Sequence, residues 1–265
     1  EAFAKAAALA DPPGWAMFVA ADLPAAKTTG TGTLTVVLDP GHGGIDPGAE
    51  NGDYTEAALM LTFARELKEV LLRDGRFQVV LTREEDAFVP LETRISIARA
   101  AGADVFLSLH ADALAEGEAT GTTLYTLSEE ASDAAAAALA ERHGRDDLLS
   151  GVDLSQQDDE VAAVLMDMAR TSTAPRTDRL ADALAVSITE GGIKMHRHPR
   201  QFAGFSVLKS PDIPSILVEL GFLSSERDLK RLVDKDWRQK MTVALRDGLI
   251  IWMDDDRALQ SMKDG

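Results

Sequence analysis

No cysteine occurs in the 265 residues of this chain. Its absence excludes a catalytic thiol, thiolate metal ligands and disulfide bonds. Any metal ion must therefore be held by His, Asp or Glu side chains. The search for a metal centre begins with the carboxylates and the five histidines.

Basic residues are the minority among the charged ones, and long apolar runs are missing. Lys and Arg number 27 against 44 Asp and Glu, which gives a net charge of −17. Such a surface is typical of a soluble protein, and it repels nucleic acid and anionic lipid, so we expect neither as a partner. No apolar run approaches the roughly 20 residues that span a bilayer, so no membrane insertion is expected. An apolar content of 45% is enough for a sizeable core.

The beginning of the chain differs in composition from the rest. Residues 1–32 are rich in Ala and Pro and end in a run of Thr and Gly, which predicts a lead-in and linker. From there, apolar runs and helical stripes alternate. We expect one domain over residues 33–255, followed by a tail over 256–265.

Short apolar segments alternate with helical patterns through most of the domain. This alternation predicts βαβ units, and hence an α/β fold with a largely parallel central sheet flanked by helices. The predicted strands cover 34–38, 77–81, 105–109, 122–127, 205–208 and 216–219, and the predicted helices cover 55–74, 91–101, 177–190 and 236–253.

Residues 128–178 interrupt this rhythm with a long, Ala-rich and acidic stretch. Helix-forming composition and an amphipathic stripe predict two helices in it, over 129–143 and 158–171. A segment of this length is not needed to complete the sheet, and such segments are usually functional or disordered. We therefore expect an inserted helical segment that leaves the core soon after His110.

Three conspicuous polar residues stand where predicted strands end, which is where open α/β sheets bind ligands. His42 follows the first strand, His110 follows the strand over 105–109, and Glu219 lies where the last strand runs out. A fourth, Glu56, opens the 55–74 helix, for which Thr55 is a plausible N-cap. We expect the four side chains to meet.

Two imidazoles and a carboxylate are a common protein shell for a catalytic zinc ion, whose fourth position stays open for water. Zinc lowers the pKa of that water to about 7, and a carboxylate outside the shell can take its proton. Glu219 is the candidate for that role. Burying a carboxylate among apolar strand residues costs several kcal/mol of folding free energy unless the group is paired or bound to a metal, so its position calls for a function. Each residue alone also has an ordinary explanation, such as a turn for His42 and the helix dipole for Glu56. Together they favour a metal-dependent hydrolase.

Several stretches occur in the order and spacing of a known family. They are 36–49, 55–56, 81–83 with Asp86 and Arg94, 108–112 and 214–224. On these stretches the sequence resembles the zinc-dependent N-acetylmuramoyl-L-alanine amidases of the Amidase_3 type, which separate bacterial daughter cells. The resemblance implies one zinc ion per chain, held by His42, Glu56 and His110, with Glu219 as the catalytic glutamate.

The resemblance also implies a reaction and a setting. The reaction is hydrolysis of the amide between N-acetylmuramic acid and L-alanine in peptidoglycan, in the periplasm or at the cell wall, with an activator from the division machinery as a partner. Two departures from the family pattern, Ala57 and Ser225, concern substrate contacts rather than the ligands. The alternatives are a zinc peptidase or deacetylase with another substrate, and a catalytically inactive wall-binding module. The complete set of four residues argues against the latter.

Relatives of this type can carry an inserted helix over the active site, with a glutamate in the open zinc position until a partner removes the helix. The resemblance therefore makes the 128–178 segment a candidate autoinhibitory element. Glu141 is the candidate plug and Glu160 the alternate, whereas His143 is interpreted as a surface residue. A solvated helical hairpin without a regulatory role is the other interpretation.

Four arginines of the motifs and loops are interpreted as substrate-binding or structural residues. Arg197 and Arg200 lie in a predicted loop with a His-x-His pair at 196–198, and they suit the carboxylates of stem peptides. We favour substrate binding there over a second metal site. Arg83 and Arg94 are interpreted as structural ion-pair partners.

Overall fold

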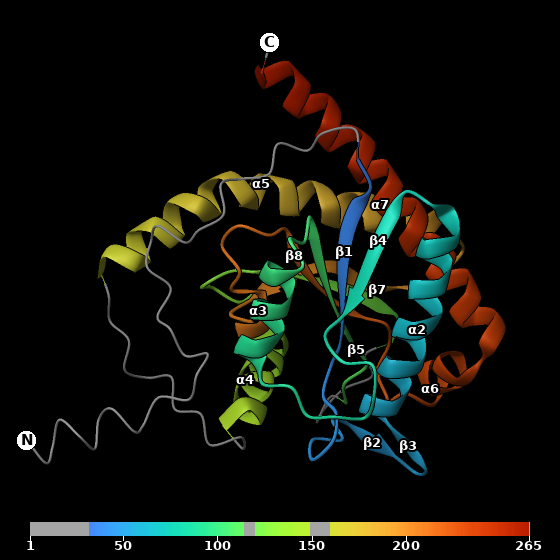
Figure 1. The fold of residues 1–265 in the computed structure, drawn as a ribbon. Coiled ribbons are helices and arrows are strands. Elements are labelled where there is room, and N and C mark those ends of the chain that lie inside the picture. The colour runs from blue at the N-terminus through green and yellow to red at the C-terminus, as the bar shows by residue number, and fades with distance from the viewer. Residues whose placement is uncertain (1–31, 114–119, 149–159, 265) are drawn as a thin grey trace, which may run out of the picture.

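A six-stranded sheet forms the centre of the protein. The computed structural model describes residues 32–113, 120–148 and 160–264, so the expected lead-in lies almost wholly outside the described residues. The strand order is β4-β1-β5-β8-β6-β7, and the first four strands run parallel, while β6 is antiparallel to β8 and parallel to β7 (Figure 1). The predicted α/β class is confirmed. The strands are β1 (Leu34–Pro40), β4 (Phe77–Leu81), β5 (Val105–His110), β6 (Thr122–Leu127), β7 (Met195–Ala203) and β8 (Ser215–Glu219).

Helices cover both faces of this sheet. On one face lie α2 (Glu56–Asp74), α5 (Glu160–Glu190) and α7 (Lys235–Asp264), with α6 (Glu226–Val233) packed against α7. On the other lie α3 (Leu91–Ala100), α4 (Ala134–Leu148) and the short 3-10 helix η2 (Ser206–Leu208). A small hairpin of β2 (Glu50–Asn51) and β3 (Tyr54–Thr55) precedes α2.

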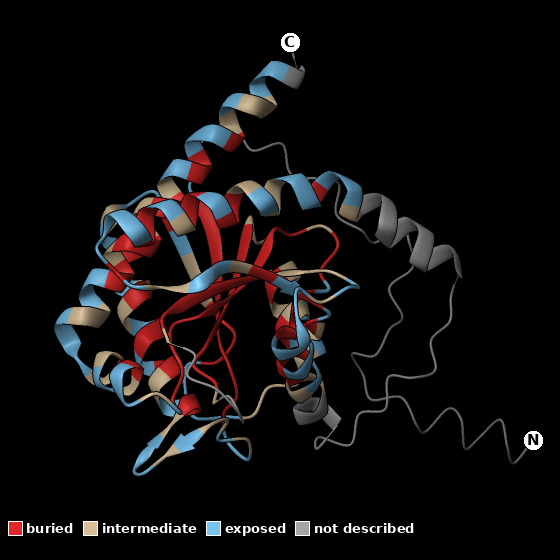
Figure 2. Cartoon of the chain, turned by 180° about the vertical axis from the view of Figure 1, so that it is seen from behind, coloured by how far each residue is buried: buried red, intermediate tan, exposed pale blue. Residues whose placement is uncertain are grey.

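Side chains alternate between the two faces along each strand, as the pleat requires. On β1, Val36 and Leu38 pack into the core beneath α2, α5 and α7, whereas Val37 packs against the α3 and α4 side. The central strands β1, β5 and β8 are accordingly buried along their whole length, and exposed residues gather on the outer sides of the helices (Figure 2). Within the described part of the chain, no helix combines the length and apolar character that a membrane crossing requires.

The helix α2 shows how local sequence sets the elements. The Thr55 hydroxyl accepts a hydrogen bond from the amide of Ala58 at 3.3 Å, which caps the first turn, and Gly75 ends the helix with φ of +82°. The capped start places Glu56 in the first turn, at the carboxyl edge of the sheet. The predicted helices over 55–74 and 91–101 are confirmed, as are the predicted strands other than 205–208.

Three elements differ from the sequence prediction. The helices expected over 158–171 and 177–190 are one helix, α5, which continues through Pro175. The segment over 195–203 is an edge strand rather than a loop, and its many polar residues reflect the exposed edge. The strand expected over 205–208 is the 3-10 turn η2.

Packing against α7 accounts for the continuous helix α5. Leu180 and Leu184 are fully buried in the core shared with α7, and the Trp252 indole N–H donates to the carbonyl of Arg176 at 3.0 Å. Proline ends an isolated helix by removing one donor, but tertiary contacts of this kind hold the flanking turns in place. The helix α7 also continues past residue 255 to Asp264, through the expected tail.

Candidate metal centre

The carboxyl ends of β1, β5 and β8 meet at one edge of the sheet, as the parallel order predicts. His110 ends β5 directly opposite Glu219 on β8, and His42 follows β1 by two residues. Glu56 reaches this edge from the start of α2. The structure thus brings together all four residues that the sequence singled out, and all four are buried.

Backbone strain and two arginines shape the loop that presents His42. Its φ is +58°, a left-handed conformation uncommon outside glycine, and Gly43 and Gly44 follow with positive φ as well. The Arg94 guanidinium donates to the carbonyl of His42 at 3.0 Å, and Arg83 donates to the carbonyl of Gly41 at 2.9 Å. These contacts hold the loop in its strained form.

The two arginines therefore have structural roles, as interpreted from sequence, although the details differ. Arg94 forms a buried ion pair with Asp39 at 2.7 Å. Arg83 binds main-chain carbonyls, including those of Pro40 at 2.9 Å and Ala57 at 2.8 Å. It thereby ties the end of β1 to the start of α2, which carry two of the site residues.

The carboxylate of Glu56 lies between the two predicted histidine ligands. Its Oε2 is 3.2 Å from His42 Nε2, and its Oε1 is 3.0 Å from His110 Nδ1. Ligand atoms around a tetrahedral zinc with bonds near 2.1 Å stand about 3.4 Å apart. The amides of Ala49 and Ala111 donate to the same carboxylate at 3.0 and 2.9 Å, which fixes its orientation.

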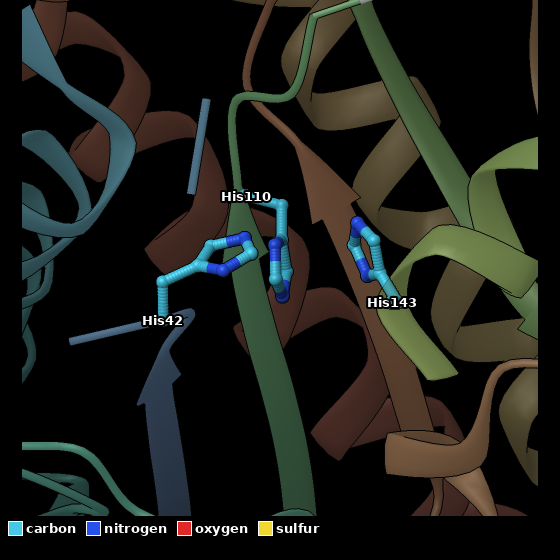
Figure 3. A group of neighbouring side chains, drawn as sticks. All are labelled: His42, His110 and His143. Atoms are coloured by element: carbon cyan, nitrogen blue, oxygen red, sulfur yellow. The ribbon is translucent and has the colours of Figure 1, made fainter. Parts of the chain in front are cut away.

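A third histidine joins this group, and the interpretation of His143 as a surface residue is wrong. His143 is only 7% exposed, and its ring centroid lies 4.3 Å from that of His110 and 5.8 Å from that of His42. The three side chains converge from β5, α4 and the loop after β1 (Figure 3). One ligand nitrogen from each lies within 4.8 Å of the others.

The position of His143 on α4 was recoverable from the helical period. Ala136, Leu139 and Ala140 are buried on the same helix, and His143 continues their stripe at the next turn. The Ala-rich composition of the segment hides this stripe, because alanine occurs on both faces. A polar residue in phase with the buried alanines and leucine was the available signal.

The other predicted site residues lie away from this group. Glu141 is exposed on α4, beside an open depression lined by Glu129 and Ser206, and the side chain of Glu160 lies outside the described residues. Arg197 is exposed on β7. Arg200 forms ion pairs with α5, one to Asp178 at 2.8 Å and the other to Asp182.

Glu219 has one engaged oxygen and one available oxygen. Its Oε2 accepts a hydrogen bond from the amide of Asp112 at 3.1 Å, and its Oε1 has no hydrogen-bond partner among the described residues. Burial raises the pKa of Glu219, and the nearby charges of Glu56 and Asp112 raise it further. A carboxyl group so placed is suited to accept and return a proton.

The charges of the ligand residues are strongly coupled. Burial opposes protonation of His42, but Glu56 and Asp46 outweigh it and raise the pKa of His42 to about 11. Burial and His143 lower the pKa of His110 to about 4. Although burial favours the neutral acid, His42 and His110 hold the pKa of Glu56 well below its usual range. The site therefore keeps Glu56 ionised and favours a positive charge next to it.

The unpartnered atoms of the site are those that a cation would satisfy. Within the described part of the chain, four buried atoms of the site make no hydrogen bond: His42 Nε2, His143 Nε2, Glu219 Oε1 and Asp112 Oδ2. Their nearest charged neighbours are Glu56 Oε2, 3.2 Å from His42 Nε2, and Asp112 Oδ2, 3.5 Å from His143 Nε2. Buried polar atoms without a partner are rare and need an explanation. The nitrogens of His42 and His110, 3.2 and 3.0 Å from the carboxylate oxygens of Glu56, are donors of the kind and spacing that fit zinc.

Buried histidines and carboxylates at the carboxyl edge of an α/β sheet define a metal-dependent hydrolase. The chain belongs to the N-acetylmuramoyl-L-alanine amidase family, which it matches over residues 36–250. It is similar to the N-acetylmuramoyl-L-alanine amidase AmiA of Escherichia coli K12, at 37% identity over 241 residues that cover 89% of this chain and 82% of the relative. AmiC of Neisseria meningitidis serogroup B is 38% identical over 218 residues, 81% of this chain and 51% of the relative.

Solved structures agree with this assignment. The N-acetylmuramoyl-L-alanine amidase AmiC2 of Nostoc punctiforme superposes with a TM-score of 0.59 at 27% identity, covering 85% of this chain and 99% of that one. An N-acetylmuramoyl-L-alanine amidase from Clostridium difficile 630 shares the fold, with a TM-score of 0.62 at 22% identity. This chain is therefore an N-acetylmuramoyl-L-alanine amidase.

Proposed function

We propose that the enzyme is a zinc amidase that cuts the bond between N-acetylmuramic acid and L-alanine in peptidoglycan. The observation that carries the proposal is the carboxylate of Glu56, placed 3.2 Å from His42 Nε2 and 3.0 Å from His110 Nδ1, with Glu219 beside His110 at the end of the neighbouring strand β8. This arrangement supplies three ligands and a separate proton acceptor. A catalytically inactive module has no need for both.

Each protein group has a defined task in this reaction. Zinc bound at these atoms would polarise the scissile carbonyl and stabilise negative charge on its oxygen. Glu219 accepts the proton of the attacking water at Oε1 and then delivers it to the alanine nitrogen, so that the C–N bond breaks. The Asp112 amide holds the other oxygen of Glu219 in place during both transfers.

A digestion of purified peptidoglycan tests the reaction and the metal together. The holoenzyme is expected to release intact stem peptides with a free L-alanine amino group, identified by mass, and leave lactyl-bearing glycan strands. Removal of zinc with a chelator should stop the release, and added Zn²⁺ should restore it. Release of single amino acids or of acetate would instead support the peptidase or deacetylase alternative.

The inserted segment places α4 directly against the site. The Arg142 guanidinium pairs with Asp112 at 2.6 Å, and the ring of His143 packs on Phe205 with centroids 5.6 Å apart. We propose that α4 is an autoinhibitory element and that His143, rather than Glu141, fills the fourth metal position. In this proposal an activator removes α4, and the enzyme acts in daughter-cell separation in the periplasm or at the cell wall.

Comparison of His143→Ala with Glu141→Ala tests this gate. His143→Ala opens the fourth position to water and leaves His42, Glu56 and His110 in place, so wall hydrolysis should rise several-fold with zinc retained. Glu141→Ala, changed on the exposed side of the same helix, should match the wild type. Activation by Glu141→Ala alone would show that Glu141, and not His143, blocks the fourth metal position. Equal rates of hydrolysis for all three folded proteins would contradict autoinhibition by α4.

A further inference from the structure

The two histidines that face Glu56 have different partners on their outer nitrogens. His42 Nδ1 lies 2.7 Å from Asp46 Oδ2, whereas His110 Nε2 lies 3.2 Å from the hydroxyl of Ser108. We propose that Asp46, and Ser108 acting with Asp39, are positioning residues that make His42 bind the metal through Nε2 and His110 through Nδ1. The inference rests on the proposed zinc site. It gives roles to residues that are not themselves ligands of the metal.

The contact with Asp46 fixes the first ring. A carboxylate accepts hydrogen bonds and, when ionised, cannot donate, so the Nδ1 of His42 must carry the hydrogen. Nε2 is then the nitrogen that gives up its hydrogen when a metal binds, and its lone pair lies on the side of Glu56, whose Oε2 is 3.2 Å away. Asp46 is itself held by the amide of Gly48, which donates to Oδ1 at 3.0 Å, and by backbone pairing with Gly43.

The second ring is fixed by a relay through one hydroxyl hydrogen. The Ser108 hydroxyl lies 2.7 Å from Asp39 Oδ2, and Asp39 Oδ1 already accepts from Thr82 at 2.6 Å and from the Arg94 guanidinium at 2.7 Å. Paired with a guanidinium that stays charged, Asp39 is an ionised acceptor. The single hydroxyl hydrogen of Ser108 therefore points to Asp39.

The direction of that hydrogen decides which nitrogen of His110 binds. Ser108 Oγ can only accept from the ring, so Nε2 carries a hydrogen and Nδ1 presents its lone pair towards Glu56 Oε1, 3.0 Å away. The reverse arrangement would leave Asp39 Oδ2 without its buried donor, which is costly. In both rings the nitrogen left to bind the metal lies 3.0–3.2 Å from an oxygen of Glu56, which suits a metal ion that contacts the rings and this carboxylate.

Nitrogen-15 NMR of the zinc-loaded protein tests the assignment directly. Long-range proton–nitrogen correlations should show zinc on Nε2 of His42 and on Nδ1 of His110, with a hydrogen on the other nitrogen of each ring. Single His→Gln variants assign the signals, and the exposed His198 supplies a reference for an unbound ring. Coordination of both histidines through the same type of nitrogen would overturn the inference.

Zinc affinity measured by competition with a chromophoric chelator supplies a second readout. Loss of an outer partner usually weakens a metal site by about 10–100-fold, so Asp46→Ala and Ser108→Ala should each do so. Asp46→Asn retains an acceptor for the Nδ1 hydrogen and should lose less than Asp46→Ala. Asp86→Asn is the matched control, because Asp86 binds the amide of Gly44 in the same loop at 2.8 Å and contacts neither ring.

The outcomes separate this inference from the zinc site itself. Thermal unfolding of the metal-free variants shows whether each one folds, and the NMR test on the wild type needs no variant. Unchanged zinc affinity in folded Asp46→Ala and Ser108→Ala would overturn the positioning roles while the zinc site stands. A wild-type protein that binds no zinc would overturn the proposed function and this inference together.

Discussion

Glu219→Gln is expected to keep one zinc ion per chain and to lose amidase activity by roughly 10²–10⁴-fold, the usual worth of a positioned acid–base group. Glutamine preserves the shape and can still accept from the Asp112 amide, which donates to Oε2 of Glu219 at 3.1 Å. It cannot take a proton at the position of Oε1. Activity is measured as peptide release from purified peptidoglycan, and zinc by elemental analysis of the same samples.

The matched control is Glu69→Gln, which makes the same chemical change on the exposed face of α2, where Glu69 pairs with Arg73. Its activity and zinc content should equal those of the wild type. If Glu219→Gln retained near-wild-type activity with zinc bound, the carboxylate would have a structural role, and another group would have to accept the proton.

Four site residues at the carboxyl edge of the sheet were predictable from local sequence signals. Parallel strands align their carboxyl ends, so His42, His110 and Glu219 were expected at one edge once the strands over 34–38, 105–109 and 216–219 were identified. The strand order β1-β5-β8 then places them next to one another. Glu56 followed from the N-cap at Thr55. Strand periodicity and capping are local signals, and they were sufficient for this part of the site.

Residues brought in by tertiary packing were not predictable in the same way. His143 reaches the site because α4 packs against η2 and β7. The helical period marks the buried face of α4, but no local signal shows which elements that face packs against. The same holds for Pro175, where contacts with α7 keep α5 continuous. The ion pairs of Arg200 with Asp178 and Asp182 on α5 were not predicted either, because charge alone does not show which residues the fold brings together, and its predicted role in substrate binding stays a prediction.

The two proposals concern the ligands of the same metal ion. One assigns His42, Glu56 and His110 as ligands, and the other adds His143 as a fourth, inhibitory ligand. In the closed state the proposal gives the metal four protein ligands, and removal of α4 leaves three with one open position. Replacement of a ligand therefore has to be judged with α4 in mind. His143 lies 4.3 Å from His110, measured between ring centroids, and is close enough to substitute for a missing partner.

His110→Ala should consequently lower zinc affinity and abolish wall hydrolysis, because a three-ligand shell has no spare member once α4 leaves. In the closed protein His143 can retain part of the zinc, so His110→Ala with His143→Ala should lose more zinc than His110→Ala alone. His198→Ala removes an exposed histidine and should keep one zinc ion and full activity. Zinc per chain after dialysis, with peptide release from peptidoglycan, measures both effects. One full equivalent of zinc in the double variant would show that the metal binds elsewhere, and the assignment of His110 as a ligand would fail.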